Sequence, residues 1–345
     1  GGACDNAESN TCIGHASGAT MTNADSNTFV GFQSGNALTT GSNNVAMGYN
    51  ALVSQQQGHN NTAIGYKALE DANENVSNLN TAVGANAALN LSTAIKTVAV
   101  GHDAIGSGVC TGDKNVAVGQ GAGYALIAGH QNTLVGADAG VAITSGRDNV
   151  IIGTAAGGND VNFATGDQCT IIGSHADTSA TNSSNQIAIG YDVSCIANST
   201  VTIGIGSSTA SLGLDGSDTS WAAASSDERY KENITTSTAG LSFVNDLRPV
   251  TYNWKKAKDV PSDMPAYKEG SDEPVFGYEY GETLHGFIAQ EVKAVVDGHS
   301  EIKEGFKMWK LRDDGVQTVA DGNLVPILVK AVQELSAKVK ALEDA

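Results

Sequence analysis

Basic residues are scarce in this chain of 345 residues. Its 19 Lys and Arg stand against 37 Asp and Glu, so the formal net charge is −18. The shortage is strongest in residues 1–225, with 4 basic and 16 acidic residues, whereas residues 226–345 have 15 and 21. A surface of this sign repels nucleic acid and anionic lipid, so we expect neither as a direct partner.

Cysteine motifs and acidic metal loops are also missing. The five Cys show no C-x-x-C spacing and their number is odd, which argues against a disulfide scaffold and a zinc site. The acidic residues do not form the Asp-x-Asp-x-Asx-Gly loop that binds calcium. We therefore assign no metal and no cofactor, and we interpret the cysteines as small, semi-buried residues. They are Cys4, Cys12, Cys110, Cys169 and Cys195.

Long apolar runs are absent as well. No run reaches the roughly 18 residues that a membrane-spanning helix needs, so we expect no membrane insertion. No signal peptide is visible, and the sequence starts with Gly1 and Gly2 rather than Met. We therefore expect a fragment or a trimmed product.

Glycine is abundant and marks an internal repeat. Of 41 Gly, 32 precede Ser226, and they lack the Gly-X-Y period of collagen. A short unit ends twelve times in glycine, with gaps of 17, 17, 17, 19, 17, 18, 17, 17, 20, 17 and 14 residues. The glycines are Gly14, Gly31, Gly48, Gly65, Gly84, Gly101, Gly119, Gly136, Gly153, Gly173, Gly190 and Gly204. This period predicts a β-solenoid of stacked turns, on the order of 55 Å long at one strand spacing per turn.

Each unit contains a three-residue apolar pattern before its glycine. Val, Ile or Met precedes the glycine and Thr, Val or Ile lies two residues earlier, so these positions share one face of a strand. The position between them is usually Ala, as at Ala46, Ala63 and Ala82, and points the other way. We expect the larger residues to face inward and the alanines to form an external stripe, which three chains on one axis would cover.

An Asn precedes most of these strands and predicts a ladder of side-chain hydrogen bonds. The ladder residues are Asn10, Asn27, Asn44, Asn61, Asn80, Asn115, Asn132 and Asn149. Four units replace the Asn, with Thr97, Cys169, Gln186 and Thr200. The repeat, with units such as Asn-Val-Ala-Met-Gly at 44–48 and Asn-Thr-Ala-Ile-Gly at 61–65, resembles the left-handed β-roll head repeat of trimeric autotransporter adhesins and related phage fibres, over roughly residues 8–206. The core signature of that head repeat reads Asn-x-Val-Ala-Ile-Gly. That resemblance implies a homotrimer, with recognition in the loops between strands.

The repeat ends before a connector at residues 207–225, and the sequence after the connector has helix and strand patterns without a repeat. Residues 241–247 predict a short helix, residues 249–254 a strand, and a helix opens at residues 285–292. A hairpin is expected across residues 308–319.

The last segment follows Pro326 and has apolar residues spaced 4, 3, 4 and 3. They are Leu328, Val332, Leu335, Val339 and Leu342. This heptad predicts a coiled-coil helix, and a trimer would match the repeat region, although the heptad alone leaves the number of strands open.

Four motifs in the second part resemble one family. They read Ser-Asp-Glu-Arg-Tyr-Lys-Glu-Asn-Ile at 226–234, Leu-Arg-Pro-Val-Thr-Tyr-Asn-Trp at 247–254, Gly-Phe-Ile-Ala-Gln-Glu-Val at 286–292 and Leu-Val-Pro-Ile-Leu-Val-Lys-Ala-Val-Gln-Glu-Leu at 324–335. Together they resemble the self-cleaving intramolecular chaperone domain at the C-terminus of phage tail fibres and endosialidase tailspikes.

The resemblance implies that this domain trimerises, drives folding of the preceding fibre and is released by a Ser–Lys dyad. It places the nucleophile at Ser226, the base at Lys231 and the cleaved bond between Ser225 and Ser226. A lysine gives up its proton readily only when it is buried, so cleavage would follow assembly. The only enzymatic activity expected is this single self-cleavage.

The expected fold is an all-β, left-handed parallel β-roll or β-solenoid, homotrimeric, followed by an α+β chaperone domain that ends in a trimeric coiled-coil helix. The expected domains are the repeat region at 1–206, the connector at 207–225 and the chaperone at 226–345. The leading function is a viral tail fibre that binds a host cell-surface glycan or protein and contacts other virion tail proteins. It would fold in the host cytoplasm, reside in the virion and be extracellular after release.

Three alternatives remain at this point. A polysaccharide-depolymerising tailspike needs a pair of catalytic carboxylates, and no such pair shares a register here. A cellular trimeric adhesin stays open, whereas an ice-binding solenoid is disfavoured because its Thr residues are expected to face inward.

Tyr49, Tyr66 and Tyr191 could stack on sugars, but packing between turns is the favoured interpretation.

Overall fold

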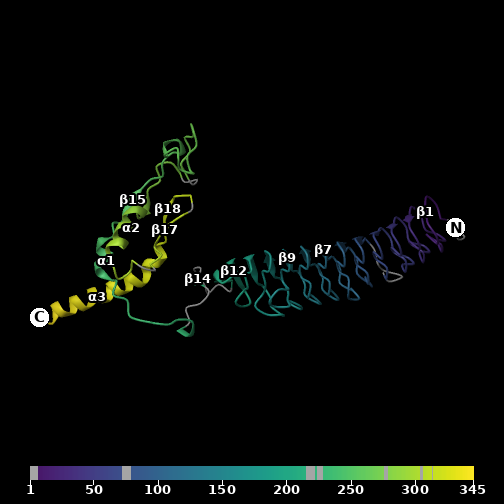
Figure 1. Cartoon of the computed structure of the whole chain (residues 1–345), viewed down its shortest axis with the longest axis horizontal. Coiled ribbons are helices and arrows are strands. Elements are labelled where there is room, and N and C mark those ends of the chain that lie inside the picture. Colours follow the sequence, from purple (N-terminus) through teal and green to yellow (C-terminus); the bar gives the residue numbers. More distant parts are fainter. Residues whose placement is uncertain are drawn as a thin grey trace. The chain divides into compact units, whose positions relative to one another are not determined.

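The computed structural model shows two compact units, Gly1–Tyr230 and Lys231–Ala345 (Figure 1). The residues that the structure describes are 7–71, 79–214, 222–223, 228–275, 279–303, 306–312 and 314–345. The first unit is a β-solenoid of about 11 turns, and the second is a small α+β unit that ends in a helix. The succession of folds expected from the sequence is confirmed.

Twelve short strands stack in parallel and in chain order, one per turn (Figure 1). They are β1 (Thr11–Ile13), β2 (Thr28–Val30), β3 (Val45–Met47), β4 (Thr62–Ile64), β5 (Thr81–Val83), β6 (Val98–Val100), β7 (Val116–Val118), β8 (Thr133–Val135), β9 (Val150–Ile152), β10 (Thr170–Ile172), β11 (Ile187–Tyr191) and β12 (Thr200–Ile205). β13 (Ser208–Gly213) and β14 (Ala222–Ala223) continue the sheet in antiparallel pairing. Part of the expected connector is therefore strand.

The repeated glycines form the corner at which the chain leaves each strand. The eleven from Gly14 to Gly190 have φ between +130° and +140°, a region that side chains with a Cβ rarely adopt. They also lie against the backbone of the next turn, because a Cβ at Gly136 would lie 2.5 Å from the carbonyl oxygen of Gly153. Both the turn and the close stacking therefore require glycine.

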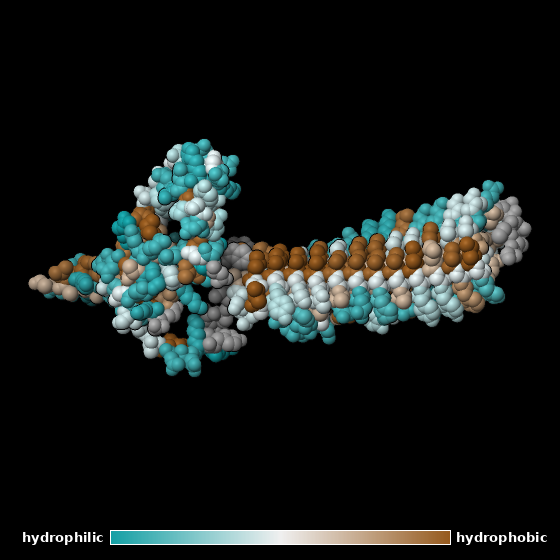
Figure 2. Space-filling view, turned by 45° about the horizontal axis from the view of Figure 1, so that its top comes forward, coloured by the Kyte–Doolittle hydropathy of each residue, from teal (hydrophilic) through white to brown (hydrophobic). Residues whose placement is uncertain are grey.

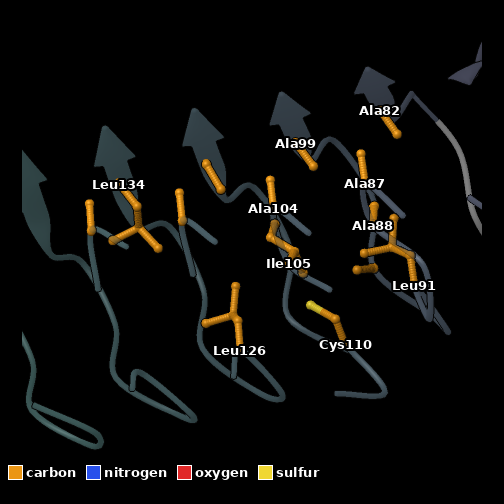
Figure 3. Close-up of a cluster of buried hydrophobic side chains, with 14 of the residues drawn as sticks. Ala82, Ala87, Ala88, Leu91, Ala99, Ala104, Ile105, Cys110, Leu126 and Leu134 are labelled. Carbon is orange, nitrogen blue, oxygen red and sulfur yellow. The ribbon is translucent and has the colours of Figure 1, made fainter. Parts of the chain in front are cut away.

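The alanines of the strands face the interior, so the prediction of an external alanine stripe is wrong. Ala46, Ala63 and Ala82 are fully buried, whereas the Val, Ile or Met residues before the glycines are partly or largely exposed. Figure 3 shows alanines of several turns beside Leu91, Ile105 and Leu126, which come from the loops. In turns with an alanine on the strand, the thin interior takes its large side chains from the loops.

Size complementarity between strand and loop supports this arrangement. Buried Ala46 is followed six residues later by buried Leu52, and Ala63 is followed in the same way by Leu69. At β2 the strand residue is large and the loop position is glycine: Phe29 is buried, and a Cβ at Gly35 would lie 2.7 Å from its ring. In these turns a large side chain thus fills the same volume from one wall or the other.

The Thr and Val residues of the strands face outward, which bears on the ice-binding alternative. Thr28, Thr62 and Thr81 are half-buried on the outside of the strands rather than inside. The sequence had argued against an ice-binding solenoid from inward-facing Thr, and that reason no longer holds.

The predicted Asn ladder is confirmed and lies inside the solenoid. In Asn44, the backbone N–H and the side-chain Nδ2 donate to Oδ1 of Asn27, at 2.9 and 3.1 Å. The same Nδ2 donates to the carbonyl of Gly58 at 2.8 Å. Asn132 and Asn149 repeat the side-chain pair at 3.0 Å. Each buried amide is therefore satisfied by its neighbours along the axis.

The interruption of this ladder at Thr97 leaves a buried hydroxyl. The Thr97 N–H donates to Oδ1 of Asn80 at 2.9 Å, but Thr97 Oγ1 has no hydrogen-bond partner among the described residues. An unsatisfied buried polar atom costs about 1–3 kcal/mol.

We predict that Thr97→Asn stabilises the solenoid by about 1 kcal/mol, because it restores the ladder. The measurement is the urea midpoint of the β-sheet circular dichroism signal. Thr97→Val is the control, since it removes the unpaired hydroxyl without restoring the ladder and should gain less. A lower midpoint for Thr97→Asn than for the wild type would contradict the prediction.

The second unit combines three helices and two small antiparallel sheets (Figure 1). Its helices are α1 (Leu241–Asp246), α2 (Ala289–Gly298) and α3 (Val325–Glu343), with short 3-10 turns η2 (Ala257–Asp259) and η4 (Asp321–Leu324); η1 (Glu228–Tyr230) ends the first unit. The sheets pair β15 (Val250–Tyr252) with β16 (Leu284–Gly286), and β17 (Trp309–Leu311) with β18 (Gln317–Val319). α2 begins at Ala289, later than expected, because residues 284–286 form a strand.

A hydrophobic core joins the three helices with β17 and β18. Phe243 from α1, Val292 from α2 and Ile327 from α3 are buried in one cluster with Met308. In the part of the chain that the structure describes, no helix combines the length and the apolar character needed to cross a membrane.

Candidate functional site

The expected cleavage site is only partly within the described residues. Ser225 and Ser226 lie outside them, so the structure gives no geometry for the predicted nucleophile. Lys231 is described and exposed, at the start of an exposed segment that extends to residue 238. The single chain therefore does not provide the burial that a lysine base requires.

The second and third motifs are brought together by the fold. Val250 pairs with Gly286 in the β15–β16 ladder. Beside it, the guanidinium of Arg248 forms two hydrogen bonds with the carboxylate of Glu291, with Nε 2.9 Å from Oε2. These hydrogen bonds lower the pKa of Glu291, although both side chains are exposed and such pairs stabilise a fold only slightly. The second and third motifs thus contact each other through a strand pair and an ion pair.

The fourth motif caps the first helix. Oε2 of Glu334, on α3, accepts the backbone N–H of Leu241 at 2.9 Å. The same carboxylate lies against Gly240, where a Cβ would lie 2.8 Å from it. A carboxylate at this end of α1 also complements the helix dipole. This hydrogen bond links α3 to the start of α1.

A histidine between two carboxylates forms a cluster that the sequence analysis missed. His299 Nε2 lies 2.8 Å from Asp246 Oδ2, and His299 Nδ1 lies 2.9 Å from Glu301 Oε1. The bonds to Glu301 and Asp246 raise the pKa of His299, because both favour the charged ring. The His299 ring also packs edge-on against Phe243. Asp246 and His299 are 53 residues apart, so no local pattern could have indicated the contact.

The predicted heptad forms a continuous face on α3. Ile327 and Ala331 pack into the core of the unit, whereas the heptad residues are exposed. They are Leu328, Val332, Leu335, Val339 and Leu342. From Leu335 onward every residue of α3 is exposed, so the second half of the helix has no covered face in the single chain.

Aromatic rings stack on one another along the first four turns of the solenoid. Phe32 and Tyr49 are 5.1 Å apart between ring centroids, and Tyr49 and Tyr66 are 5.5 Å apart, with nearly parallel planes. His15 extends the stack at 5.3 Å from Phe32. The interpretation that Tyr49 and Tyr66 pack between turns is confirmed by this stacking, while about half of each residue stays exposed. Tyr191 is largely exposed and lies edge-on to His175.

The described cysteines lie mostly in the interior. Burial raises the pKa of Cys110 and of Cys169 to about 11, so neither forms a reactive thiolate at neutral pH. Within the ranges given above, no three His, Cys, Asp or Glu residues are grouped to hold a metal ion.

Residues 226–300 match the family model for the chaperone of endosialidase. The match begins at Ser226 and includes α1, β15, β16 and α2. This match supports the endosialidase-type chaperone domain that the first three motifs indicated, and the fourth motif, at 324–335, lies outside the matched residues. No curated protein and no solved structure matches the chain.

Proposed function

We propose that this chain is a homotrimeric tail-fibre protein of a phage, matured by its own C-terminal chaperone. The chaperone unit directs trimerisation and folding of the solenoid and is then released between Ser225 and Ser226. The observation that carries the proposal is the match of residues 226–300 to the chaperone of endosialidase, directly after a repetitive solenoid. The solenoid would be the part that persists in the virion.

The solenoid needs help to start folding, because its turns are not stable one at a time. One three-residue strand buries almost nothing alone, and each turn is stabilised only by its neighbours. Some turns must therefore become ordered before neighbouring turns can stack on them. An assembled C-terminal unit that holds several chains together would raise their local concentration during this step.

The proposed cleavage uses Ser226 and Lys231. The Ser226 hydroxyl attacks the carbonyl carbon of Ser225, and its proton passes to the Lys231 amine. The peptide C–N bond breaks as the Ser226 nitrogen takes up a proton, which leaves an ester between the Ser225 carbonyl and the Ser226 oxygen. Water then hydrolyses this ester and separates the two parts. Because Lys231 is exposed in the single chain, assembly would have to bury it before the step proceeds.

Attachment to a host glycan or protein is proposed for the loops of the solenoid. Loops on a rigid scaffold commonly carry recognition, and the loops here vary in length from turn to turn. A binding screen of the purified protein against glycans and whole cells tests this part.

We expect Ser226→Ala to abolish the release of a fragment that spans residues 226–345. Gel electrophoresis of the full-length product, with mass spectrometry of the fragment ends, measures this result. Lys231→Ala should give the same loss, because the hydroxyl then has no base. Ser225→Ala is the matched control and should still be cleaved. Unaltered cleavage in Ser226→Ala would reject the assigned nucleophile.

A further inference from the structure

Two rows of side chains run along the outside of the solenoid strands. They are in register from turn to turn, and we call them together the outward stripe. The first row is Ile13, Val30, Met47, Ile64, Val83, Val100, Val118, Val135, Ile152, Ile172, Ile189 and Ile203. The second is Thr11, Thr28, Val45, Thr62, Thr81, Val98, Val116, Thr133, Val150, Thr170 and Ile187, whereas the next residue in register, Val201, is buried.

The first row of the outward stripe is apolar over the whole solenoid, and the second row mixes Thr with Val and Ile. Figure 2 shows an apolar row that continues from turn to turn on one face of this unit. Met47, Ile152 and Ile203 are 42%, 38% and 42% exposed. At about 4.8 Å per turn the stripe is on the order of 50 Å long, longer than the scattered apolar patches of a typical monomer surface.

No residue of the outward stripe is charged, although the chain has a net charge of −18. A partner of opposite charge would be bound through acidic side chains, and the stripe has none. Copies of this acidic chain repel one another over most of their surfaces, so an uncharged face is where they can approach closely. The composition of the stripe therefore fits a second copy better than a basic partner.

The same chain has another uncovered apolar face on α3. Both faces repeat regularly along the chain, and both are exposed in the single chain. Copies joined in parallel through α3 have solenoids of identical length and identical spacing between turns. A parallel contact without axial shift then places each apolar residue of the stripe opposite its own equivalent.

We propose that the outward stripe is the interface between parallel, in-register copies of this chain. The proposal rests on the self-association in the proposed function and identifies the face that mediates it in the solenoid. A contact about 50 Å long and about 10 Å wide buries on the order of 1,000 Å² per pair, which reaches the lower limit for specific interfaces.

Site-specific cross-linking of the full chain tests the proposal. Ile152→Cys places a thiol in the outward stripe, and Ile127→Cys places one on the loop between β7 and β8. The two positions are matched, because both are Ile and are 38% and 45% exposed. Cys4 and Cys12 are replaced by Ser in both variants, and a short bismaleimide is the reagent.

We expect more than half of the Ile152→Cys chains to be linked in pairs and at least tenfold fewer of the Ile127→Cys chains. Sedimentation of the untreated protein gives the number of copies. An oligomer in which Ile152→Cys is not linked, or is linked no more than Ile127→Cys, overturns the assignment of the stripe and leaves the self-association intact. A single chain in sedimentation overturns both, and leaves the stripe free for another surface such as ice.

Discussion

Replacing Gly136 by Ala should destabilise the solenoid by about 4 kcal/mol. The backbone of Gly136 has φ +135°, and adopting it with a Cβ costs about 1–3 kcal/mol. The added Cβ would also lie 2.5 Å from the Gly153 carbonyl oxygen, so adjacent turns must separate, and such overpacking costs about 1–3 kcal/mol. The measurement is the urea midpoint of the β-sheet circular dichroism signal.

Gly206→Ala is the matched control for this prediction. Gly206 also has positive φ, at +53°, but a Cβ there would have no neighbour within 4 Å. Gly206→Ala should therefore lower the free energy of unfolding only by the cost of a left-handed backbone, about 1–2 kcal/mol. If Gly136→Ala unfolds at the same urea concentration as Gly206→Ala, close stacking of the turns does not contribute to stability as described.

Leu335→Glu combined with Val339→Glu should convert the assembled protein into single chains. Both side chains are exposed on α3 in the single chain and lie in the heptad that we propose to be the coiled-coil seam. Burial of one such side chain contributes about 1.5–3 kcal/mol, and burial of an unpaired carboxylate adds a further cost. The double variant therefore loses at least about 4 kcal/mol per chain, roughly a thousandfold in affinity.

Sedimentation velocity at micromolar concentration measures this effect. Ala337→Glu is the control, because it adds a carboxylate to the exposed part of α3 outside the heptad. It should leave the assembly unchanged. In the proposed function the double variant also yields less soluble solenoid, since chaperoned folding requires assembly. An assembly that survives the double substitution would remove α3 as its seam.

The period of the solenoid could be read from the sequence, whereas its inside and outside could not. Alternation along a strand defines two faces but not which one is buried. The larger side chains at Val45 and Met47 suggested the interior, yet Ala46 is the buried residue. A readable signal was present in the loops, because Leu52 follows Ala46 whereas Gly35 follows Phe29. Only a strand residue that shares a volume with the loop residue would produce this exchange of sizes.

The second unit was predictable to the extent that its motifs are local. The helix at α1, the β17–β18 hairpin and the heptad follow from short-range patterns, and each is present. The cluster of His299 with Asp246 and Glu301 depends on contacts between distant segments, so no spacing rule indicated it. The base proposed at Lys231 depends on burial, and this side chain is exposed in the single chain.

Equivalent residues pair in successive strands, so the solenoid can gain or lose whole turns. Each turn contacts only the turns before and after it, and successive strands pair at identical positions. Removal of the 17 residues from one corner glycine to the next, such as Gly119 to Gly136, would shorten the stack by about 4.8 Å and rejoin equivalent backbone. Recombination between repeats would therefore lengthen or shorten the solenoid without creating a new fold.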